Sequence, residues 1–323
     1  MKLGIIGTGM IVKDLLTTIN ELNIELTSLL ATPQTKDEGA QLCSDYGITN
    51  LYLEYTKLLE GDADTIYIAL PNHLHFIFAK EALEKGKHVI IEKPIVPCIA
   101  ELMTLKKIAD EKNLIVIEAM NIQYLPTFKL LKDKISKIGE IKIAQFNYSQ
   151  YSSRYNDFKK GIIHPAFDPK KHGGALMDLN IYNIHSLIGL FGSPIDSIYY
   201  ANMENNIDTS GIIQLNYGNM KATSIAAKDC KAPVVMSIQG TEGCIVIETP
   251  MNILTRFTIH MNSGEIERVD SGDIKHRLYH EFKEFSSIID NLDINKANEM
   301  FDFSIQALNI IERSRLQNMG ELS

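Results

Sequence analysis

A short apolar strand that runs directly into two closely spaced glycines constrains the fold of this chain most. Residues 2–6 read as a buried strand, Gly7-Thr8-Gly9 follows, and a helical pattern then continues to Leu22. Glycine at position 7 permits a tight turn, and glycine at position 9 lets an anionic group approach the backbone. The free N–H groups at the start of the following helix favour phosphate. A strand before the glycines and a helix after them predict the dinucleotide-binding turn of an α/β domain.

The same alternation of short strands and helices continues to about residue 120. Further strands rich in branched apolar residues are expected at 24–30, 50–53, 64–70, 87–91 and 114–118, with helices at 55–60, 73–85 and 99–112. Buried strands that alternate with helices indicate a parallel sheet covered on both faces. We therefore predict that residues 1–120 form a Rossmann domain with a doubly wound parallel sheet.

The end of the second expected strand bears on which dinucleotide is bound. A site that selects NAD usually has an acid here, which holds the ribose 2′-hydroxyl. This chain has Ala31-Thr32-Pro33 instead, and no arginine stands nearby. Thr32, Gln34, Thr35 and Lys36 could bond either a hydroxyl or a 2′-phosphate. The predicted cofactor is NADP or NAD, with NADP favoured.

Two opposite charges stand at the end of the strand expected at 87–91. Glu92 and Lys93 follow its apolar residues, and Pro94 then denies the sheet a further hydrogen-bond donor. Ligands of open parallel sheets bind at the carboxyl ends of the strands. The alternative for this tripeptide alone is a solvated ion pair in a turn.

Residues 121–323 are predicted to form a second domain with a different architecture. Its expected strands lie at 140–151, 195–203, 210–217, 220–227, 234–239, 244–248, 254–260 and 265–269. Its expected helices lie at 126–138, 276–289 and 296–317, with a further helix that follows Gly174 and continues to about residue 191. Consecutive strands with short turns indicate an α+β domain with a large, mostly antiparallel open sheet. The few helices can cover only one face, so we expect the other to form a homodimer or a dimer of dimers.

The helix expected to follow Gly174 and to continue to about Phe191 carries an unusual set of polar residues. Asp178, Tyr182 and His185 are spaced i, i+4 and i+7, which places them on one face of an α-helix, and Gly173-Gly174 precede them as a flexible entry. A packed side chain with satisfied polar atoms is the favoured reading for His185. For Asp178 and Tyr182 together we favour a functional role. No third and fourth ligand accompanies them, so a zinc site is not expected.

Together these motifs resemble the Gfo/Idh/MocA oxidoreductases, which take their name from glucose–fructose oxidoreductase and inositol dehydrogenase. The matching motifs are Gly7-Thr-Gly9, Pro71-Asn72 with His75, Gly86-Lys-His-Val, Glu92-Lys93-Pro94, Glu118-Ala119 and Gly173-Gly174-Ala-Leu-x-Asp178. Tyr182 stands where many members have histidine, as in the branch that resembles dihydrodiol dehydrogenase, glucose–fructose oxidoreductase and some xylose dehydrogenases. Asn180 replaces a common glycine, and Asn121-Ile-Gln-Tyr124 replaces aromatic and basic residues. Both departures are expected to line the substrate pocket.

The resemblance implies an NAD(P)-dependent oxidoreductase that moves a hydride between nicotinamide and a secondary or anomeric alcohol of a sugar, polyol or related cyclic alcohol. Tyr182 is the expected base; its phenol has a free pKa of about 10, which the Lys93 ammonium would lower. Asp178 is expected to orient Lys93 or a sugar hydroxyl. The alternative is a nucleotide-binding regulatory or sensor protein without turnover, which would have no need of Lys93, Asp178 and Tyr182.

Cofactor and substrate contacts are expected from residues of both domains. Those predicted to contact the cofactor are Gly7, Thr8, Gly9, Met10, Ile11, Ala31, Thr32, Leu70, Pro71, Asn72, His75, Glu92 and Lys93. Those predicted to contact the substrate, besides the catalytic residues, are Asn121, Tyr124 and His185.

Charge and cysteine usage exclude several other classes of protein. The 323 residues carry a formal net charge of −8 and no basic run, which argues against nucleic acid or an anionic membrane as partner. No apolar stretch approaches the roughly 20 residues needed to span a bilayer, and no signal-peptide pattern is present, so we expect a cytoplasmic protein. Cys43, Cys98, Cys230 and Cys244 lack paired metal spacing and are expected to be reduced thiols, with no metal.

Overall fold

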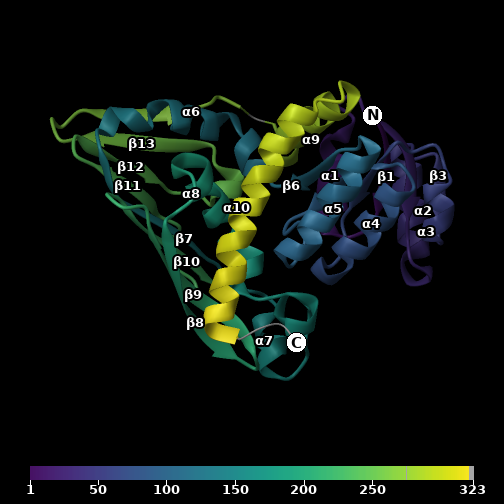
Figure 1. Cartoon of the computed structure of the whole chain (residues 1–323), viewed down its shortest axis with the longest axis horizontal. Coiled ribbons are helices and arrows are strands. Elements are labelled where there is room, and N and C mark those ends of the chain that lie inside the picture. The colour runs from purple at the N-terminus through teal and green to yellow at the C-terminus, as the bar shows by residue number, and fades with distance from the viewer. Residues whose placement is uncertain (274, 320–323) are drawn as a thin grey trace. The chain divides into compact units, whose positions relative to one another are not determined.

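The computed structural model describes residues 1–273 and 275–319, which fall into two compact units (Figure 1). Unit 1 consists of residues 1–120 and 275–305, and unit 2 of the described residues of 121–274 and 306–323. The expected boundary after residue 120 coincides with the end of the first segment of unit 1. The helix α9 (Arg277–Asp290) and the first part of α10 (Ile294–Met319), which we had assigned to the second domain, belong to unit 1.

Unit 1 is the predicted doubly wound domain. Its six strands are β1 (Lys2–Ile6), β2 (Glu25–Leu30), β3 (Asn50–Tyr52), β4 (Thr65–Ile68), β5 (His88–Glu92) and β6 (Val116–Ala119). They are all parallel and lie in the order β3-β2-β1-β4-β5-β6. Its other helices are α1 (Met10–Ile19), α2 (Lys36–Tyr46), α3 (Tyr55–Leu59), α4 (His75–Glu84) and α5 (Ile99–Lys112). The strand order reverses between β1 and β4, where ligands of such sheets bind.

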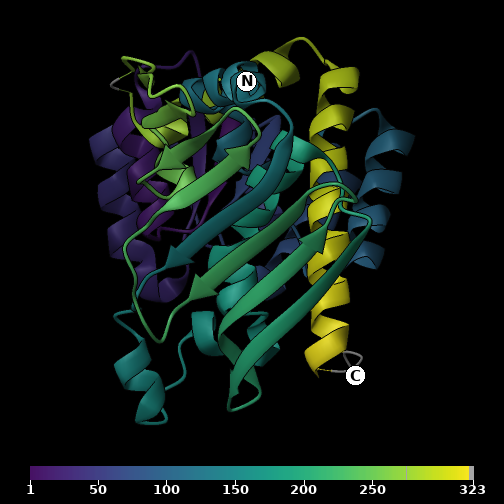
Figure 2. The same cartoon turned by 90° about the vertical axis from the view of Figure 1, so that its left-hand side faces the viewer.

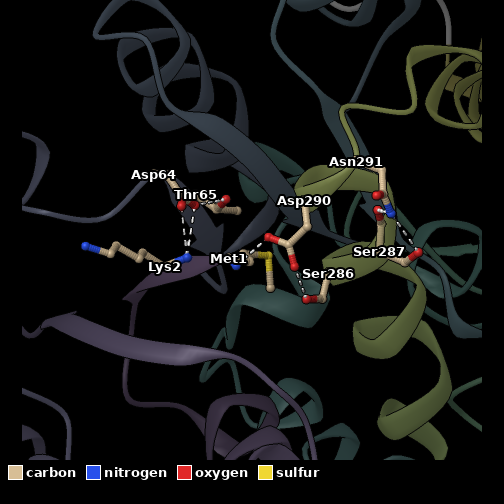
Figure 3. A network of polar contacts seen from close by, with 8 residues as sticks. All are labelled: Met1, Lys2, Asp64, Thr65, Ser286, Ser287, Asp290 and Asn291. Carbon is tan, nitrogen blue, oxygen red and sulfur yellow. Dashed lines mark hydrogen bonds and ion pairs between the residues drawn. The ribbon is translucent and has the colours of Figure 1, made fainter.

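The apolar face of α9 explains why this late helix belongs to unit 1. Phe282 packs edge-on against Tyr67 of β4, with ring centroids 5.1 Å apart, and both side chains are buried. At the end of α9 the amino group of Met1 lies 2.5 Å from Asp290 Oδ1, and Ser286 donates to Asp290 Oδ2 (Figure 3). The end of α9 is thereby bound to Met1, the residue that precedes β1.

Unit 2 contains the predicted mostly antiparallel sheet. Its eight strands are β7 (Ile141–Ser149), β8 (Asp196–Glu204), β9 (Ile207–Asn216), β10 (Lys221–Ala227), β11 (Met236–Gly240), β12 (Gly243–Ile247), β13 (Arg256–Met261) and β14 (Ile266–Asp270). They lie in the order β14-β13-β12-β11-β7-β10-β9-β8, and the β7–β10 pair is parallel. The helices of this unit are α6 (Pro126–Lys134), α7 (Tyr155–Lys159), α8 (Ile181–Phe191) and the rest of α10.

One face of the unit 2 sheet is left open by the described helices, and Figure 2 looks onto it. Tyr200 of β8 is paired with Ile212 of β9, so the two side chains stand on the same face. Both are exposed, as are Ile198 and Ile143 on this face. An apolar surface of this kind is what the sequence predicted for the uncovered side of the sheet. Among the described residues, no helix is both long and apolar enough to cross a membrane.

Candidate active site

The glycine turn after β1 leaves open space at the start of α1. Gly7 has a φ of +109°, and a Cβ there would lie 2.7 Å from the carbonyl oxygen of Ala69, so only glycine fits. Gly9 caps α1 with an ordinary φ of −69°, and no described atom lies within 4 Å of the place its Cβ would take. No described side chain caps this helix end. The N–H groups there can therefore face a pyrophosphate.

A carboxylate that the sequence analysis overlooked lies beside this turn. Glu38, in the first turn of α2, accepts from Thr8 Oγ1 at 2.8 Å and from Lys13 Nζ at 2.5 Å. The hydrogen bonds from Lys13 and Thr8 lower the pKa of the Glu38 carboxyl, so it is ionised at neutral pH. Glu38 thus joins α2 to the glycine turn.

The end of β2 presents hydroxyl groups. The Thr32 N–H donates to Thr35 Oγ1 at 3.1 Å, and the two threonine hydroxyls are also 3.1 Å apart. Ala31 is buried, whereas Thr32 is exposed. Hydroxyls can donate to a phosphate as well as to a ribose oxygen.

His75 lies inside unit 1 between two loops. Its ring nitrogens are 2.7 Å from the carbonyl oxygen of Leu70 and 2.9 Å from that of Pro94. The side chain is fully buried, and burial lowers the pKa of His75, although the backbone carbonyl groups of Leu70 and Pro94 oppose this. We predicted that His75 contacts the cofactor; its ring atoms are committed to the backbone of the loops after β4 and β5.

Glu118 also bonds the backbone of the segment that follows Lys93. One carboxylate oxygen of this buried residue accepts from the Ile95 N–H at 3.0 Å, and the other accepts from Ser304 Oγ at 2.6 Å. The Lys93–Pro94 peptide bond is cis. His75 and Glu118 therefore fix the backbone on which Lys93 is carried.

Two carboxyls of unit 1 interact, that of Glu92 at the end of β5 and that of the buried Glu281 on α9. Tyr67 donates to Glu92 Oε1 at 2.5 Å. Burial raises the pKa of the Glu92 carboxyl, although Tyr67 and Lys93 oppose this. Burial, and then the charge of Glu92, raise the pKa of the Glu281 carboxyl well above its ordinary value, and Arg277 opposes this. Burial therefore favours the protonated form of the Glu281 carboxyl.

In unit 2 the helix that carries Asp178 does not begin as an α-helix. Residues Leu176–Asn180 form a π turn, and α8 starts only at Ile181. We predicted one continuous α-helix that places Asp178, Tyr182 and His185 on one face. The wider π turn changes the angular spacing between Asp178 and the other two. Asp178 is partly exposed, while Tyr182 and His185 are buried.

The start of the π turn is fixed by a buried acid on β9. Asp208 Oδ2 accepts from the Leu176 N–H at 2.6 Å and from the Tyr199 hydroxyl at 2.8 Å. Gly174 has a φ of +106°, and a Cβ there would lie 2.0 Å from Asp208 Oδ1. The two glycines at 173 and 174 are thus explained by close packing, because a Cβ on Gly173 would also meet backbone within 3 Å.

The two proposed catalytic residues of unit 2 have defined neighbours. Asp178 Oδ2 lies 2.9 Å from Lys228 Nζ, at the end of β10. The ring of Tyr182 lies 6.0 Å from that of Tyr148 on β7, measured between centroids. We expected Asp178 to orient Lys93 or a sugar hydroxyl, and the ion pair with Lys228 was not anticipated.

The residues predicted to line the substrate pocket are buried. Asn180 is fully enclosed, and its Oδ1 accepts from Ser224 Oγ at 2.5 Å and from Asn183 Nδ2 at 3.1 Å. Asn121 donates to the carbonyl oxygen of Asn252 at 2.7 Å. Tyr124 and His185 are buried as well. Asn180 therefore supports the π turn by a bond to β10 and offers no surface to a ligand.

The sequence analysis missed Glu281 and Lys228, of which only Glu281 has a recognisable sequence signal. Glu281 interrupts the apolar positions of a helical pattern that includes Leu278 and Phe282, and an acid on an apolar face is a signal of burial. Lys228 stands in the charged run Lys228-Asp-Cys-Lys231, which reads as an ordinary turn. Among the described residues, no group of three or more metal-ligating side chains is gathered.

Both units match known protein families. Residues 1–120 match the family described as "Oxidoreductase family, NAD-binding Rossmann fold", and residues 129–246 match the "GFO/IDH/MocA C-terminal domain". The chain belongs to the Gfo/Idh/MocA family. This confirms the resemblance noted in the sequence and identifies an NAD(P)-dependent oxidoreductase family whose characterised relatives are CH–OH dehydrogenases.

Individual relatives of this Gfo/Idh/MocA protein extend over most of its length. It is 29% identical over 321 residues to the scyllo-inositol 2-dehydrogenase (NADP(+)) IolU of Bacillus subtilis. The matched region covers 98% of this chain and 97% of that protein. It is 25% identical over 263 residues to D-xylose 1-dehydrogenase (NADP(+)) 2 of Haloferax volcanii, and this match covers 78% of this chain and 77% of that protein. The crystal structure of KijD10, a 3-ketoreductase from Actinomadura kijaniata, has a TM-score of 0.87 at 18% identity, covering 98% and 97% of the two chains, and shows the same fold.

Proposed function

We propose that this protein interconverts a CH–OH group and a carbonyl on a sugar, polyol or related cyclic alcohol, with NADP(H) as the preferred cofactor. One observation carries the proposal. The open glycine turn after β1 and Lys93 after β5 stand at the same carboxyl edge of one parallel sheet, on the two sides of the point where the strand order reverses. A dinucleotide that lies across this edge brings its far end to Lys93.

The preference for NADP rests on the end of β2. A carboxylate there would repel a 2′-phosphate, and this position instead has the hydroxyls of Thr32 and Thr35. Glu38, an acid in the first turn of α2, is already bonded to Thr8 and Lys13. Two of the similar dehydrogenases also carry NADP(+) in their names. Fluorescence titration should give a dissociation constant for NADPH no higher than that for NADH; a strong preference for NADH would contradict this.

The residues of the chain have to manage one proton and orient the alcohol, because bound nicotinamide supplies the hydride chemistry. Lys93 donates to the substrate oxygen and stabilises the negative charge that develops on it. Tyr182 takes the hydroxyl proton during oxidation and returns it during reduction. The positive charge of Lys93 favours the phenolate form of a nearby phenol. Asp178 accepts from a neighbouring substrate hydroxyl and fixes the position of the ring.

Supporting groups keep the backbone of Lys93 in place. His75 and Glu118 bond the segment from Pro94 to Ile95, and Glu92 bonds Tyr67. These contacts hold the peptide on both sides of Lys93, which lowers the entropy lost when the ammonium engages a substrate. His75 is thus proposed as a support of the site, which differs from the cofactor contact expected for it from the sequence.

The substrate class follows from polyhydroxylated rings that the relatives are named for, inositol and xylose. The test is a panel of scyllo-inositol, myo-inositol, D-xylose and D-glucose with NADP⁺ or NAD⁺, followed at the absorbance of the reduced nicotinamide. Turnover of at least one member supports the proposal. Tight cofactor binding without turnover of any polyol or sugar on a widened panel would favour the binding or sensor alternative.

Replacement of Gly9 tests the cofactor site itself. Gly9 has an ordinary backbone conformation and open space where a side chain would go, so Gly9→Leu should fold with an unchanged melting temperature. The added side chain would occupy the pyrophosphate position and should abolish binding of both dinucleotides. Thr17→Leu, exposed near the other end of α1, is the matched control and should bind normally. Normal NADPH binding by Gly9→Leu would mean that the turn holds no pyrophosphate.

A further inference from the structure

Lys228 is a lysine whose charge is enclosed within unit 2. Its side chain is 2% exposed, and its Nζ lies 2.5 Å from the carbonyl oxygen of Ala166 and 4.3 Å from the ring centroid of Phe167. The third contact is Asp178 Oδ2, at 2.9 Å. An enclosed ammonium is costly unless an opposite charge and hydrogen-bond acceptors compensate it. The contacts with Asp178, Ala166 and Phe167 supply this compensation for Lys228.

The position of Lys228 is fixed by its backbone as well. Its N–H donates to the carbonyl oxygen of Thr209 on β9 at 2.8 Å, and its own carbonyl oxygen accepts from the Ser152 N–H at 2.8 Å. Both bonds place the residue at the end of β10, directly after Ala227 of the β7–β10 pair. The backbone from which the ammonium extends is thus anchored at the end of the sheet.

The ion pair is unequal in its exposure. The Asp178 side chain is 37% exposed, whereas that of Lys228 is 2% exposed. The carboxylate therefore reaches the surface of unit 2 while its partner holds it from within. A carboxylate on a π turn would otherwise have several rotamers, and a bond to a fixed cation selects one of them.

A second carboxyl, that of Asp208, also interacts with the charge of Lys228. Burial raises the pKa of Asp208 to about 6, although the Leu176 N–H, the Tyr199 hydroxyl and the charge of Lys228 all oppose this. Asp208 holds the start of the π turn and Asp178 lies within it. Without Lys228, the Asp178 carboxylate in the turn would lose its ion-pair partner, and the Asp208 carboxyl on β9 would lose a positive charge that favours its ionised form.

We propose that Lys228 is a positioning residue of the active site, whose enclosed ammonium holds the Asp178 carboxylate in the orientation that receives a substrate hydroxyl. This inference rests on the role that the proposed function gives to Asp178. Lys228 touches neither substrate nor cofactor in this account, and its effect is transmitted entirely through Asp178.

The test compares Lys228→Met with Lys231→Met, an exposed lysine three residues further along that serves as the control. Lys228→Met should lower kcat/KM for the sugar or polyol at least about tenfold, the effect of losing about 1.4 kcal/mol. The dissociation constant for NADPH should stay within about twofold, because the pyrophosphate turn lies in unit 1. Lys231→Met should behave as the wild type. A Lys228→Met variant with wild-type kcat/KM would overturn the inference.

A double-mutant cycle separates positioning from a merely structural role. In an Asp178→Asn background, Lys228→Met should lower kcat/KM by less than about a further twofold, because the residue that Lys228 positions is already changed. An equal loss in both backgrounds would mean that Lys228 only stabilises the fold, and would overturn the inference. Should Lys228→Met fail to fold, Lys228→Gln, which keeps a donor for Ala166 and Asp178, is measured in the same cycle with the same criteria. A wild-type protein inactive on the widened panel overturns the proposed function; an active one with an additive cycle overturns this inference alone.

Discussion

Replacing Gly174 by alanine should destabilise the protein through two separable terms. The first is backbone strain, because alanine would have to adopt a φ of +106°; a left-handed conformation costs about 1–2 kcal/mol for a residue with a Cβ. The second is the collision of the new Cβ with Asp208, 2.0 Å away. Moving Asp208 breaks its bonds to Leu176 and Tyr199, and a buried group left unsatisfied costs about 1–3 kcal/mol. The expected loss is the sum, about 2–5 kcal/mol.

Gly161→Ala provides the matched control for this experiment. Gly161 has a φ of +82° in the same unit, and no described atom lies within 4 Å of its Cβ position. Its replacement should therefore cost only the backbone term, about 1–2 kcal/mol. Urea denaturation of the two variants and the wild type measures the difference. If the two variants lose the same free energy of unfolding, within about 0.5 kcal/mol, Asp208 does not hold the π turn in the way described.

Two further predictions concern stability and assembly. The pKa of buried Glu281 is raised, so the folded state binds its proton more tightly than the unfolded state, and stability falls as pH rises above about 4.5. Glu281→Gln should therefore gain in melting temperature relative to wild type between pH 5 and pH 8; a constant difference would contradict this. The open sheet face should form a dimer at micromolar concentration by light scattering, and Tyr200→Asp with Ile212→Asp should weaken it. A wild-type monomer would refute this assembly.

The strands of both units could be predicted because their signals are local. Apolar runs mark the strands of the parallel sheet, and alternation marks those of unit 2, where β10 was expected at 220–227 and spans Lys221–Ala227. The glycine turn and the Glu92-Lys93-Pro94 segment could be recognised for the same reason. Their residues act at short range, and each occupies a strand end whose position the pattern already defines.

The environment of Asp178 could not be predicted, since it depends on residues far away in the sequence. The π turn has no residue signature of its own; it is fixed by Asp208 from β9 and Ser224 from β10. The burial of Lys228 could not be predicted, because a charged turn has no sequence signal that distinguishes a buried lysine from an exposed one. The burial of Asn180, whose side-chain oxygen accepts from Ser224, follows from the same packing.

The most direct test of the account is a double-mutant cycle on Lys93 and Tyr182, measured as kcat/KM with the best substrate of the panel. Lys93→Met and Tyr182→Phe should each lower the value at least about a hundredfold, the low end of general acid–base effects. If both residues act on one oxygen, the double variant should be little worse than either single variant, and all should bind NADPH normally. Near-normal turnover by Tyr182→Phe with unchanged pH dependence would assign the proton to another group and contradict the proposed mechanism.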